Sequence, residues 1–445
     1  MPDPLPAGGP AEPAERRSRT PRVHRAFVVA LVTLGALVAA AAFRSSTGVL
    51  FVPIEEEFGW SRSVTSGAVS LNLVIYGLTA PFAAAIMERW GVRRTVALSL
   101  LVVGVASALT TVMTAPWQLW LLWGVFVGVG TGAMALVLGA IVANRWFVTH
   151  RGLVVGIFSA ANATGQLIFL PSIAALADGP GWRAAALTVA GLSLVLVPLV
   201  LWQLIDHPEH VGARPYGELQ VAGDVPLPDT NALTEQRSPL HLAIGVLRRA
   251  SRSWVFWALM LTFWVCGWTT NGLVQTHFIP AAHDHGMPAT TAAGLLALVG
   301  AFDILGTVAS GWLTDRVDAR LLLLAYYALR GLSLLVLPSI LAPDVQPALW
   351  VFIIFYGLDW VATVPPTVAL CRQHFGLEAS GIVFGWVFAS HMVGAGVGAS
   401  VAGLIRSAHG DYRLAWLFAG ALCLAASALA LTIPRRPKEL AVVAS

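Results

Sequence analysis

Five charged or titratable side chains stand inside long apolar runs of this chain: Arg44, Asp303, Arg330, Asp359 and His391. Ionic groups are costly in such surroundings and usually mark functional sites. A guanidinium there suits bidentate capture of a carboxylate, a buried carboxylate can take up and release a proton, and an imidazole titrates near neutral pH. These residue types therefore predict anion binding and proton transfer within a membrane.

Arg44 is the strongest candidate for contact with a bound anion, together with the neighbouring Ser45. It lies roughly 12 Å inside its apolar run when the residues are counted back from Val52 at helical rise. Snorkelling to the interface from that depth is an alternative, but a strained one. The other alternative is that Arg44 forms an ion pair with a structural or gating role.

Asp303 lies near the middle of the eighth apolar run, where secondary transporters place their sites. We predict that it exchanges a proton or forms a switching ion pair with Arg44; a buried partner of a fixed arginine is the alternative. Arg330 and Asp359 stand at similar depth in consecutive runs, so we expect them to pair, with a structural role favoured over a functional one. Pro365 and Pro366 follow Asp359 and predict a kink that can serve as a hinge.

Three further polar residues stand in apolar surroundings. His391 lies near the middle of the eleventh run, and we weigh proton transfer against the commoner role of a hydrogen-bonded core residue. Asn271 and Gln275 share one helix face at i, i+4 spacing in the seventh run. They are candidate contacts to a bound solute.

The elements that position these residues are membrane-spanning helices. The chain has 445 residues, of which 57% are hydrophobic and 11% charged, and its mean hydropathy is +0.74; soluble domains carry about 25% charged residues. Runs of roughly 20 apolar residues cross a bilayer. We predict an all-α membrane protein with twelve such helices in two pseudo-symmetric bundles of six, approximately at 26–53, 65–88, 95–113, 117–143, 153–175, 184–204, 253–280, 290–314, 321–341, 348–371, 380–404 and 413–434.

The distribution of basic residues predicts the orientation. With the N-terminus inside, 21 of the 27 Lys and Arg fall on the cytoplasmic side, a positive-inside pattern. We therefore expect a multi-pass protein of the plasma membrane with both termini in the cytoplasm. The predicted divisions are a disordered N-terminus, an N-terminal bundle, a cytoplasmic linker, a C-terminal bundle and a cytoplasmic tail, at 1–25, 26–204, 205–252, 253–434 and 435–445.

One loop pattern occurs twice, about 227 positions apart, at matching exits of the two bundles. The first copy follows Ala84 and the second follows Gly311. Each places an acidic residue and then arginines on the basic side, where the carboxylate can face a helix N-terminus. We predict that these are gating loops; their residues are Glu88, Arg89, Arg93, Arg94, Asp315 and Arg316.

The duplicated loop resembles the signature of the major facilitator superfamily, and the chain as a whole resembles its monocarboxylate transporter and oxalate/formate antiporter branch. The stretches that carry this resemblance are 44–51, 58–62, 145–147, 151–156 and 208–217, together with Asp303. In the monocarboxylate carriers Lys is usual where Arg44 stands, and Arg is usual where Thr307 stands. The resemblance implies a carrier fold that binds carboxylates.

We predict a secondary transporter that moves a small organic anion, a monocarboxylate, by alternating access with proton coupling. An exporter of drugs or metabolites and an oxalate/formate-type exchanger are the alternatives. An enzyme or a channel is disfavoured because we find no paired catalytic carboxylates, metal-ligand spacing or pore-loop insert. The glycine patterns lack a phosphate-loop context, so neither nucleotide nor other cofactor is expected. The expected partners are the anion, protons and the lipid bilayer, without nucleic acid, and we expect a monomer.

Overall fold

The structure, a computed structural model, describes residues 24–218 and 238–435. Within these ranges the side chains at 42–49 and 51–52, and those at a few scattered positions, lie outside the description. The predicted N-terminal and C-terminal tails therefore fall almost wholly outside the described residues, as does the middle of the linker. The described chain is helical almost throughout.

The first half of the chain, residues 25–203, is named the N-half here. It forms six long helical segments, of which the fourth is interrupted by a π-helix. The elements are α1 (Arg25–Phe58), α2 (Arg62–Trp90), α3 (Val92–Thr110), α4 (Pro116–Leu119), η1 (Trp120–Val127), α5 (Gly128–Ala133), α6 (Leu136–Trp146), α7 (Arg151–Asp178) and α8 (Trp182–Gln203).

The second half, residues 254–431, is named the C-half and repeats the arrangement. Its first segment is interrupted by a π-helix, and its fourth segment continues through a kink at Gly376 into the fifth. The elements are α11 (Trp254–Gly267), η3 (Trp268–Val274), α12 (Gln275–Asp284), α13 (Ala289–Thr314), α14 (Ala319–Ile340), α15 (Pro347–Asp359), α16 (Val364–His409) and α17 (Arg413–Leu431).

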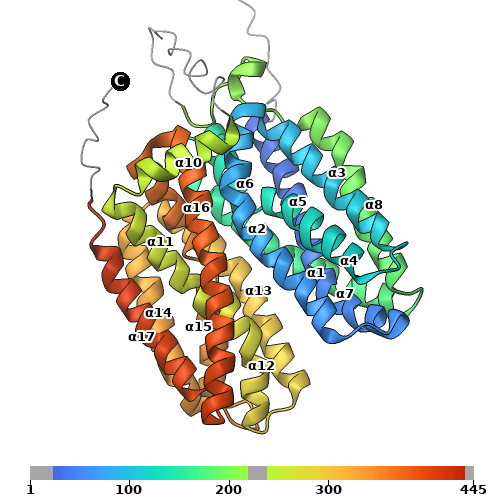
Figure 1. Cartoon of the computed structure of the whole chain (residues 1–445). Helices are drawn as coiled ribbons and strands as arrows, with labels where there is room; N and C mark the ends of the chain where they lie inside the picture. Colours follow the sequence, from blue (N-terminus) through green and yellow to red (C-terminus); the bar gives the residue numbers. More distant parts are fainter. Residues whose placement is uncertain (1–23, 219–237, 436–445) are drawn as a thin grey trace, which may run out of the picture.

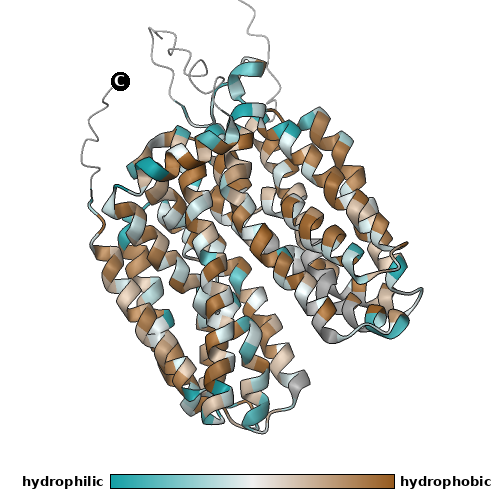
Figure 2. Cartoon of the chain, viewed as in Figure 1, coloured by the Kyte–Doolittle hydropathy of each residue, from teal (hydrophilic) through white to brown (hydrophobic). Residues whose placement is uncertain are grey.

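These helices account for the twelve predicted membrane crossings. Nine stretches of the described chain are individually long and apolar enough to span a bilayer, and one of them, Pro347–His409, has 63 residues and crosses twice. Gly376 separates its two crossings, since its φ of 77° lies in the left-handed region that favours glycine. The remaining crossings are α1, whose apolar part Arg25–Ala41 is described, and the segment of α11, η3 and α12. Figure 2 shows hydrophobic residues along the helices and hydrophilic ones gathered toward their ends.

The two halves converge at the end that carries α10 and diverge toward the opposite end (Figure 1). We call the first the linker end. The most extensive contacts across the seam between the halves are those of α7 with α13 and of α2 with α16, and α16 also contacts α6 and α7. The halves are therefore in contact at the linker end and diverge beyond it.

Glycines make the close approach of α7 and α13 possible. A Cβ added at Gly152 would collide with the carbonyl oxygen of Gly311, and one at Gly311 would collide with that of Gly152. Gly156 lies one turn further along the same contact, where its added Cβ would be 2.6 Å from the Thr307 carbonyl oxygen. Only residues without a side chain allow these backbones to touch.

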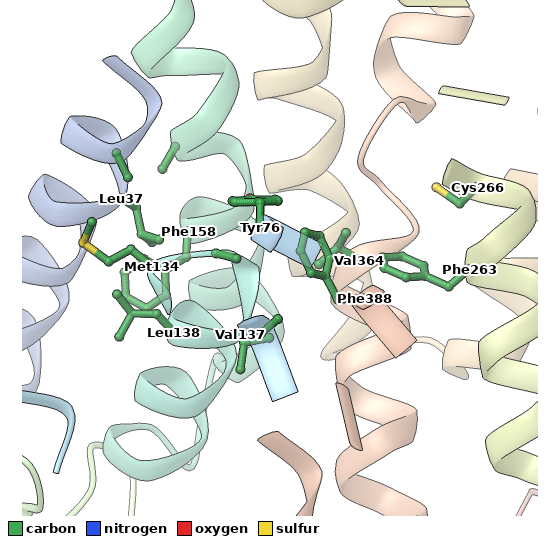
Figure 3. Close-up of a cluster of buried hydrophobic side chains, with 14 of the residues drawn as sticks. Leu37, Tyr76, Met134, Val137, Leu138, Phe158, Phe263, Cys266, Val364 and Phe388 are labelled. Atoms are coloured by element: carbon green, nitrogen blue, oxygen red, sulfur yellow. The ribbon is translucent and has the colours of Figure 1, made fainter. Parts of the chain in front are cut away.

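Buried apolar side chains of both halves form one cluster (Figure 3). In the N-half it includes Leu37 and Phe158, and in the C-half Phe263. The Tyr76 ring of α2 meets the Phe388 ring of α16 edge-on, with centroids 5.6 Å apart. The Tyr76–Phe388 contact joins the apolar interiors of the two halves across the seam.

The linker contains more structure than the sequence analysis predicted. It begins with a short 3-10 helix, η2 (Pro208–Val211), and returns to the N-half, where Tyr216 pairs with Phe147 in an isolated β-bridge. It ends with a helix of twelve residues, α10 (Pro239–Ala250), which the sequence analysis had treated as loop. Ser238 caps this helix by accepting a hydrogen bond from the His241 N–H.

Candidate functional site

The tenth membrane crossing is broken in the interior of the C-half. α15 ends at Asp359 and α16 begins at Val364, with a non-helical turn between them. Pro365 and Pro366 follow in the first turn of α16, where their missing N–H groups leave carbonyls of the preceding residues without helical partners. Backbone groups freed within a membrane must find other partners.

Arg330 of α14 supplies partners for the carbonyls of the break. Its Nη2 donates to the Asp359 carbonyl oxygen at 2.6 Å and to the Trp360 carbonyl oxygen at 3.2 Å. Its Nε donates to Oδ2 of the Asp359 side chain at 2.6 Å. The guanidinium is therefore bound to the backbone of the break as well as to the carboxylate.

Two residues of α13 satisfy the rest of the turn. Oδ1 of Asp303 accepts the Val361 N–H at 3.0 Å, and the Ser310 hydroxyl donates to the Ala362 carbonyl at 2.5 Å. Asp303, Ser310 and Arg330 are all buried. We call these three residues the clamp, because side chains from two helices hold the unwound backbone of a third.

The charges in this region are unequal. Asp303 and Asp359 supply two carboxyl groups, whereas Arg330 supplies one guanidinium among the described side chains. Asp303 accepts a second hydrogen bond from the Thr307 hydroxyl at 2.6 Å, and Oδ1 of Asp359 is buried without a hydrogen-bond partner. Among the described side chains, two carboxyl groups and one guanidinium are therefore buried together here.

A thiol and an imidazole lie next to the clamp. Nη1 of Arg330 lies 3.1 Å from Cys266 Sγ, and that sulfur lies 3.3 Å from the Thr363 hydroxyl. The buried His391 ring stacks on Phe388, with centroids 5.9 Å apart, and its Nδ1 has no partner. Asp303, Arg330, Asp359 and His391, separated by up to 88 positions in the sequence, thus gather in one interior region of the C-half.

Of the four predicted solute contacts, the structure describes the side chains of Asn271 and Gln275. Arg44 and Ser45 belong to α1, but their side chains lie outside the described residues, so the predicted pairing of Arg44 with Asp303 stays a prediction. Asn271 is partly exposed in η3, and Gln275 is exposed at the start of α12. The π-helix places Asn271 in a wider turn than the expected α-helical face, and the Thr276 hydroxyl donates to its carbonyl at 2.9 Å.

Asp315, from the second copy of the duplicated loop, caps a helix of the other half. Its carboxylate oxygens accept the N–H groups of Gly152, at 2.7 Å, and Leu153, at 3.0 Å, in the first turn of α7. The residue before that helix, His150, has a φ of 61° and makes no capping hydrogen bond of its own. The C-half thus supplies the N-cap that α7 lacks.

The first copy of the loop is arranged differently. Glu88 forms an ion pair with Arg145 Nη2 at 2.5 Å, within the N-half, although it also lies near Gly381 of α16. Arg93 is exposed, and its backbone N–H donates to Oδ1 of Asp206 at 2.7 Å. Arg89 and Arg94 lie on either side of the turn between α2 and α3. In the second copy, the Arg316 guanidinium stacks on the Trp312 ring of α13 at 4.0 Å.

Ion pairs also hold helix ends at the side opposite the linker. Arg183 donates twice to Glu57, at 2.5 and 2.7 Å, and Trp182 donates to it at 2.7 Å. These hydrogen bonds lower the pKa of the Glu57 carboxyl to about 2, chiefly through Arg183. In the C-half, Arg406 binds Asp284 at 2.8 Å and lowers the pKa of that carboxyl.

Several members of this region were not identified from the sequence. Ser310, Cys266 and Thr363 are common residue types in apolar helices, and nothing in their spacing marks them. The double proline was the available signal, since it predicts carbonyls in need of donors. Among the described residues, no group of His, Cys, Asp or Glu is arranged to hold a metal ion.

Comparison with known proteins identifies relatives along nearly the whole chain. The family model of the Major Facilitator Superfamily matches residues 32–390 and 278–444. Human monocarboxylate transporter 11 is 27% identical over 421 residues, which cover 90% of this chain and 83% of that protein. An uncharacterised MFS-type transporter of Bacillus subtilis (strain 168), YcxA, is 26% identical over 377 residues, covering 84% of this chain and 86% of that protein.

Solved structures share the fold at low identity. The fucose:proton symporter FucP of E. coli superposes with a TM-score of 0.68 at 13% identity, covering 92% of this chain and 100% of that one. The predicted arrangement of twelve helices in two bundles is thereby confirmed.

Proposed function

The chain belongs to the major facilitator superfamily, and we propose that it is a secondary active transporter that moves a small organic anion, a monocarboxylate, together with protons. The observation that carries the substrate class is the similarity to monocarboxylate transporters over most of the chain. The proton is proposed because Asp303 is a second buried carboxyl group beside the Arg330–Asp359 ion pair in the C-half.

In the proposed mechanism the guanidinium of Arg44 binds the carboxylate of the solute, and Ser45 assists it. Both stand on α1, which packs against α7 of the seam. Asn271 and Gln275 stand on the first crossing of the C-half, at or beside its π-helix, and both are accessible. These two amides can donate hydrogen bonds to the solute from the other half.

Asp303 is the proposed proton carrier. It is buried, and its hydrogen bonds come from Thr307 and from the backbone of the break. A change in its charge would therefore alter how firmly the break is held. Arg330 and Asp359 are proposed to position the break, and His391 to complete the proton path beside it.

The duplicated loops are the proposed gates at the linker end. In the structure this end is closed through Asp315 and the contact of Gly152 with Gly311. Alternating access would break these contacts and bring the opposite ends of the halves together. The proposed orientation places the linker end in the cytoplasm of the cell, at the plasma membrane, because the basic residues concentrate there.

Uptake by the purified protein in proteoliposomes tests the proposal. Lactate, pyruvate, acetate, oxalate and formate are offered with and without an inward proton gradient. Monocarboxylate uptake is expected to follow the gradient and to be lost in Arg44→Ala. Asp303→Asn is expected to abolish gradient-driven accumulation while exchange of labelled for unlabelled solute continues. Arg413→Gln, at an exposed arginine of the end opposite the linker, is the matched control.

The outcomes separate the alternatives. Anion transport by Arg44→Ala at the native rate would remove the assigned anion contact. Oxalate-for-formate exchange that ignores the proton gradient would favour an exchanger. Transport of cations or neutral hydrophobic compounds, insensitive to Arg44→Ala, would favour an exporter.

A further inference from the structure

The linker helix α10 has one face packed against the protein. Ala243, Val246 and Ala250 are buried, and the helix lies against α2 of the N-half and α16 of the C-half. The Trp386 indole N–H donates to the Ala243 carbonyl at 3.2 Å. α10 therefore lies over the seam at the linker end, where Figure 1 shows it above the helices of both halves.

The other face of α10 is exposed and combines apolar with basic side chains. Leu240 is 57% and Ile244 44% exposed, and Arg248 follows at the same four-residue interval. Arg249 and Arg252 are also exposed. The segment from Ser238 to Ser253 contains no Asp or Glu, so this face has an uncompensated positive charge.

The position of α10 is fixed relative to the membrane by the helix that follows. α11 begins at Trp254, only a few residues after α10 ends, and it is a membrane crossing. Trp254 and Trp257 are 54% and 45% exposed in its first turn, and the Trp257 indole donates to the Ser251 carbonyl at 2.8 Å. Exposed tryptophans at helix ends mark the level of the lipid headgroups.

We propose that the exposed face of α10 binds anionic phospholipid headgroups. Leu240 and Ile244 would enter the boundary of the acyl chains, while Arg248 and Arg249 bind phosphate groups above them. Helices of this composition lie in the membrane interface, and each basic residue near an anionic surface strengthens attachment. Because α10 covers the seam, the bound lipid lies directly beside the closed linker end, whatever solute the protein moves.

The test uses the full chain in vesicles, with a fluorescent label on Gly245→Cys. A Cβ at Gly245 meets nothing within 4 Å, and the three native cysteines are buried. The vesicles contain phosphatidylcholine with a minor share of phosphatidylglycerol, and either lipid is supplied in brominated form. At equal bromine content, phosphatidylglycerol is expected to quench the label more strongly.

Removal of the arginines should abolish this preference. Arg248→Gln and Arg249→Gln are each expected to lower the selectivity for phosphatidylglycerol about fivefold. Arg435→Gln, an exposed arginine at the same end outside α10, is the control and should retain the native selectivity. Equal quenching by both lipids, or the same loss in the Arg435 variant, would overturn the proposal. Absence of quenching would also overturn it and would place the face in water or against an acidic protein.

Discussion

Replacement of Arg330 tests whether the clamp holds the backbone of the break or only the side chain of Asp359. In Arg330→Leu the Asp359 carboxylate loses its ion pair and the Trp360 carbonyl loses its donor, while the Asp359 carbonyl keeps only the Ala362 N–H at 3.3 Å. Breaking a buried ion pair by removing one partner costs about 3–5 kcal/mol. We expect a loss of at least that size in the free energy of unfolding.

The double variant Arg330→Leu with Asp359→Leu separates the two roles. It removes the unpaired charge, and replacement of both partners of a buried pair by apolar residues is often neutral. If Arg330 also serves the backbone, the Trp360 carbonyl remains without a donor, at a cost of about 1–3 kcal/mol. The double variant is then expected to fall between the native protein and Arg330→Leu.

Reversible unfolding in mixed detergent micelles measures the three proteins under one set of conditions. The expected order of stability is native, double variant, Arg330→Leu. A double variant as stable as the native protein would refute the backbone role, because the Trp360 carbonyl would then have needed no donor.

Three further outcomes are expected. Gly152→Val should force α7 away from Gly311 and destabilise the closed linker end, measured as increased labelling of a cysteine placed in the seam; unchanged labelling would contradict the close contact. Asp315→Ala should remove the N-cap of α7, worth about 1 kcal/mol, and shift the equilibrium between the closed and open linker end about fivefold toward the open form. Asp315→Asn should shift that equilibrium less, and equal shifts in the two variants would argue against capping. Because the folded-state pKa of Glu57 is about 2, below the ordinary value of 4.5, its stabilising contribution exists above pH 4.5 and is lost as the pH falls toward 2. The difference in unfolding midpoint between the native protein and Glu57→Gln should therefore be constant near neutral pH and shrink below pH 4.5; a difference that grew there would contradict the Arg183 ion pair.

The membrane architecture could be predicted from the sequence because the apolar runs are long and the bilayer imposes helices on them. Arg330 and Asp359 could be matched because two charges at similar depth have few other partners. The break between α15 and α16 was foreseen from the double proline, although its bounds were not.

What could not be predicted depends on tertiary contacts. Asp303 was expected to exchange a proton or to pair with Arg44, and its additional bond to the Val361 N–H follows only from the packing of α13 against the break. Likewise, Asp315 was expected to face some helix N-terminus, but the choice of α7 required the approach of Gly152 to Gly311. The functional roles of these residues stay predictions.

α10 was missed for a different reason. Its twelve residues are too short and too polar for a membrane crossing, and the preceding prolines favoured an interpretation as loop. Its own signals were present, with Ser238 as N-cap, Pro239 at the first helical position and apolar residues on one face. Its amphipathic pattern, unlike that of the membrane crossings, is not a continuous apolar run.

The Arg330–Asp359 ion pair also bears on how the protein enters the membrane. α14 and α15 are consecutive and pack together, and each carries one member of the Arg330–Asp359 pair. Entering the bilayer separately, each would bring an isolated charge at a cost of about 2.5–3.5 kcal/mol; as a hairpin they are electrically neutral. The pair thus favours joint insertion of these two helices during synthesis, before the rest of the C-half exists to surround them.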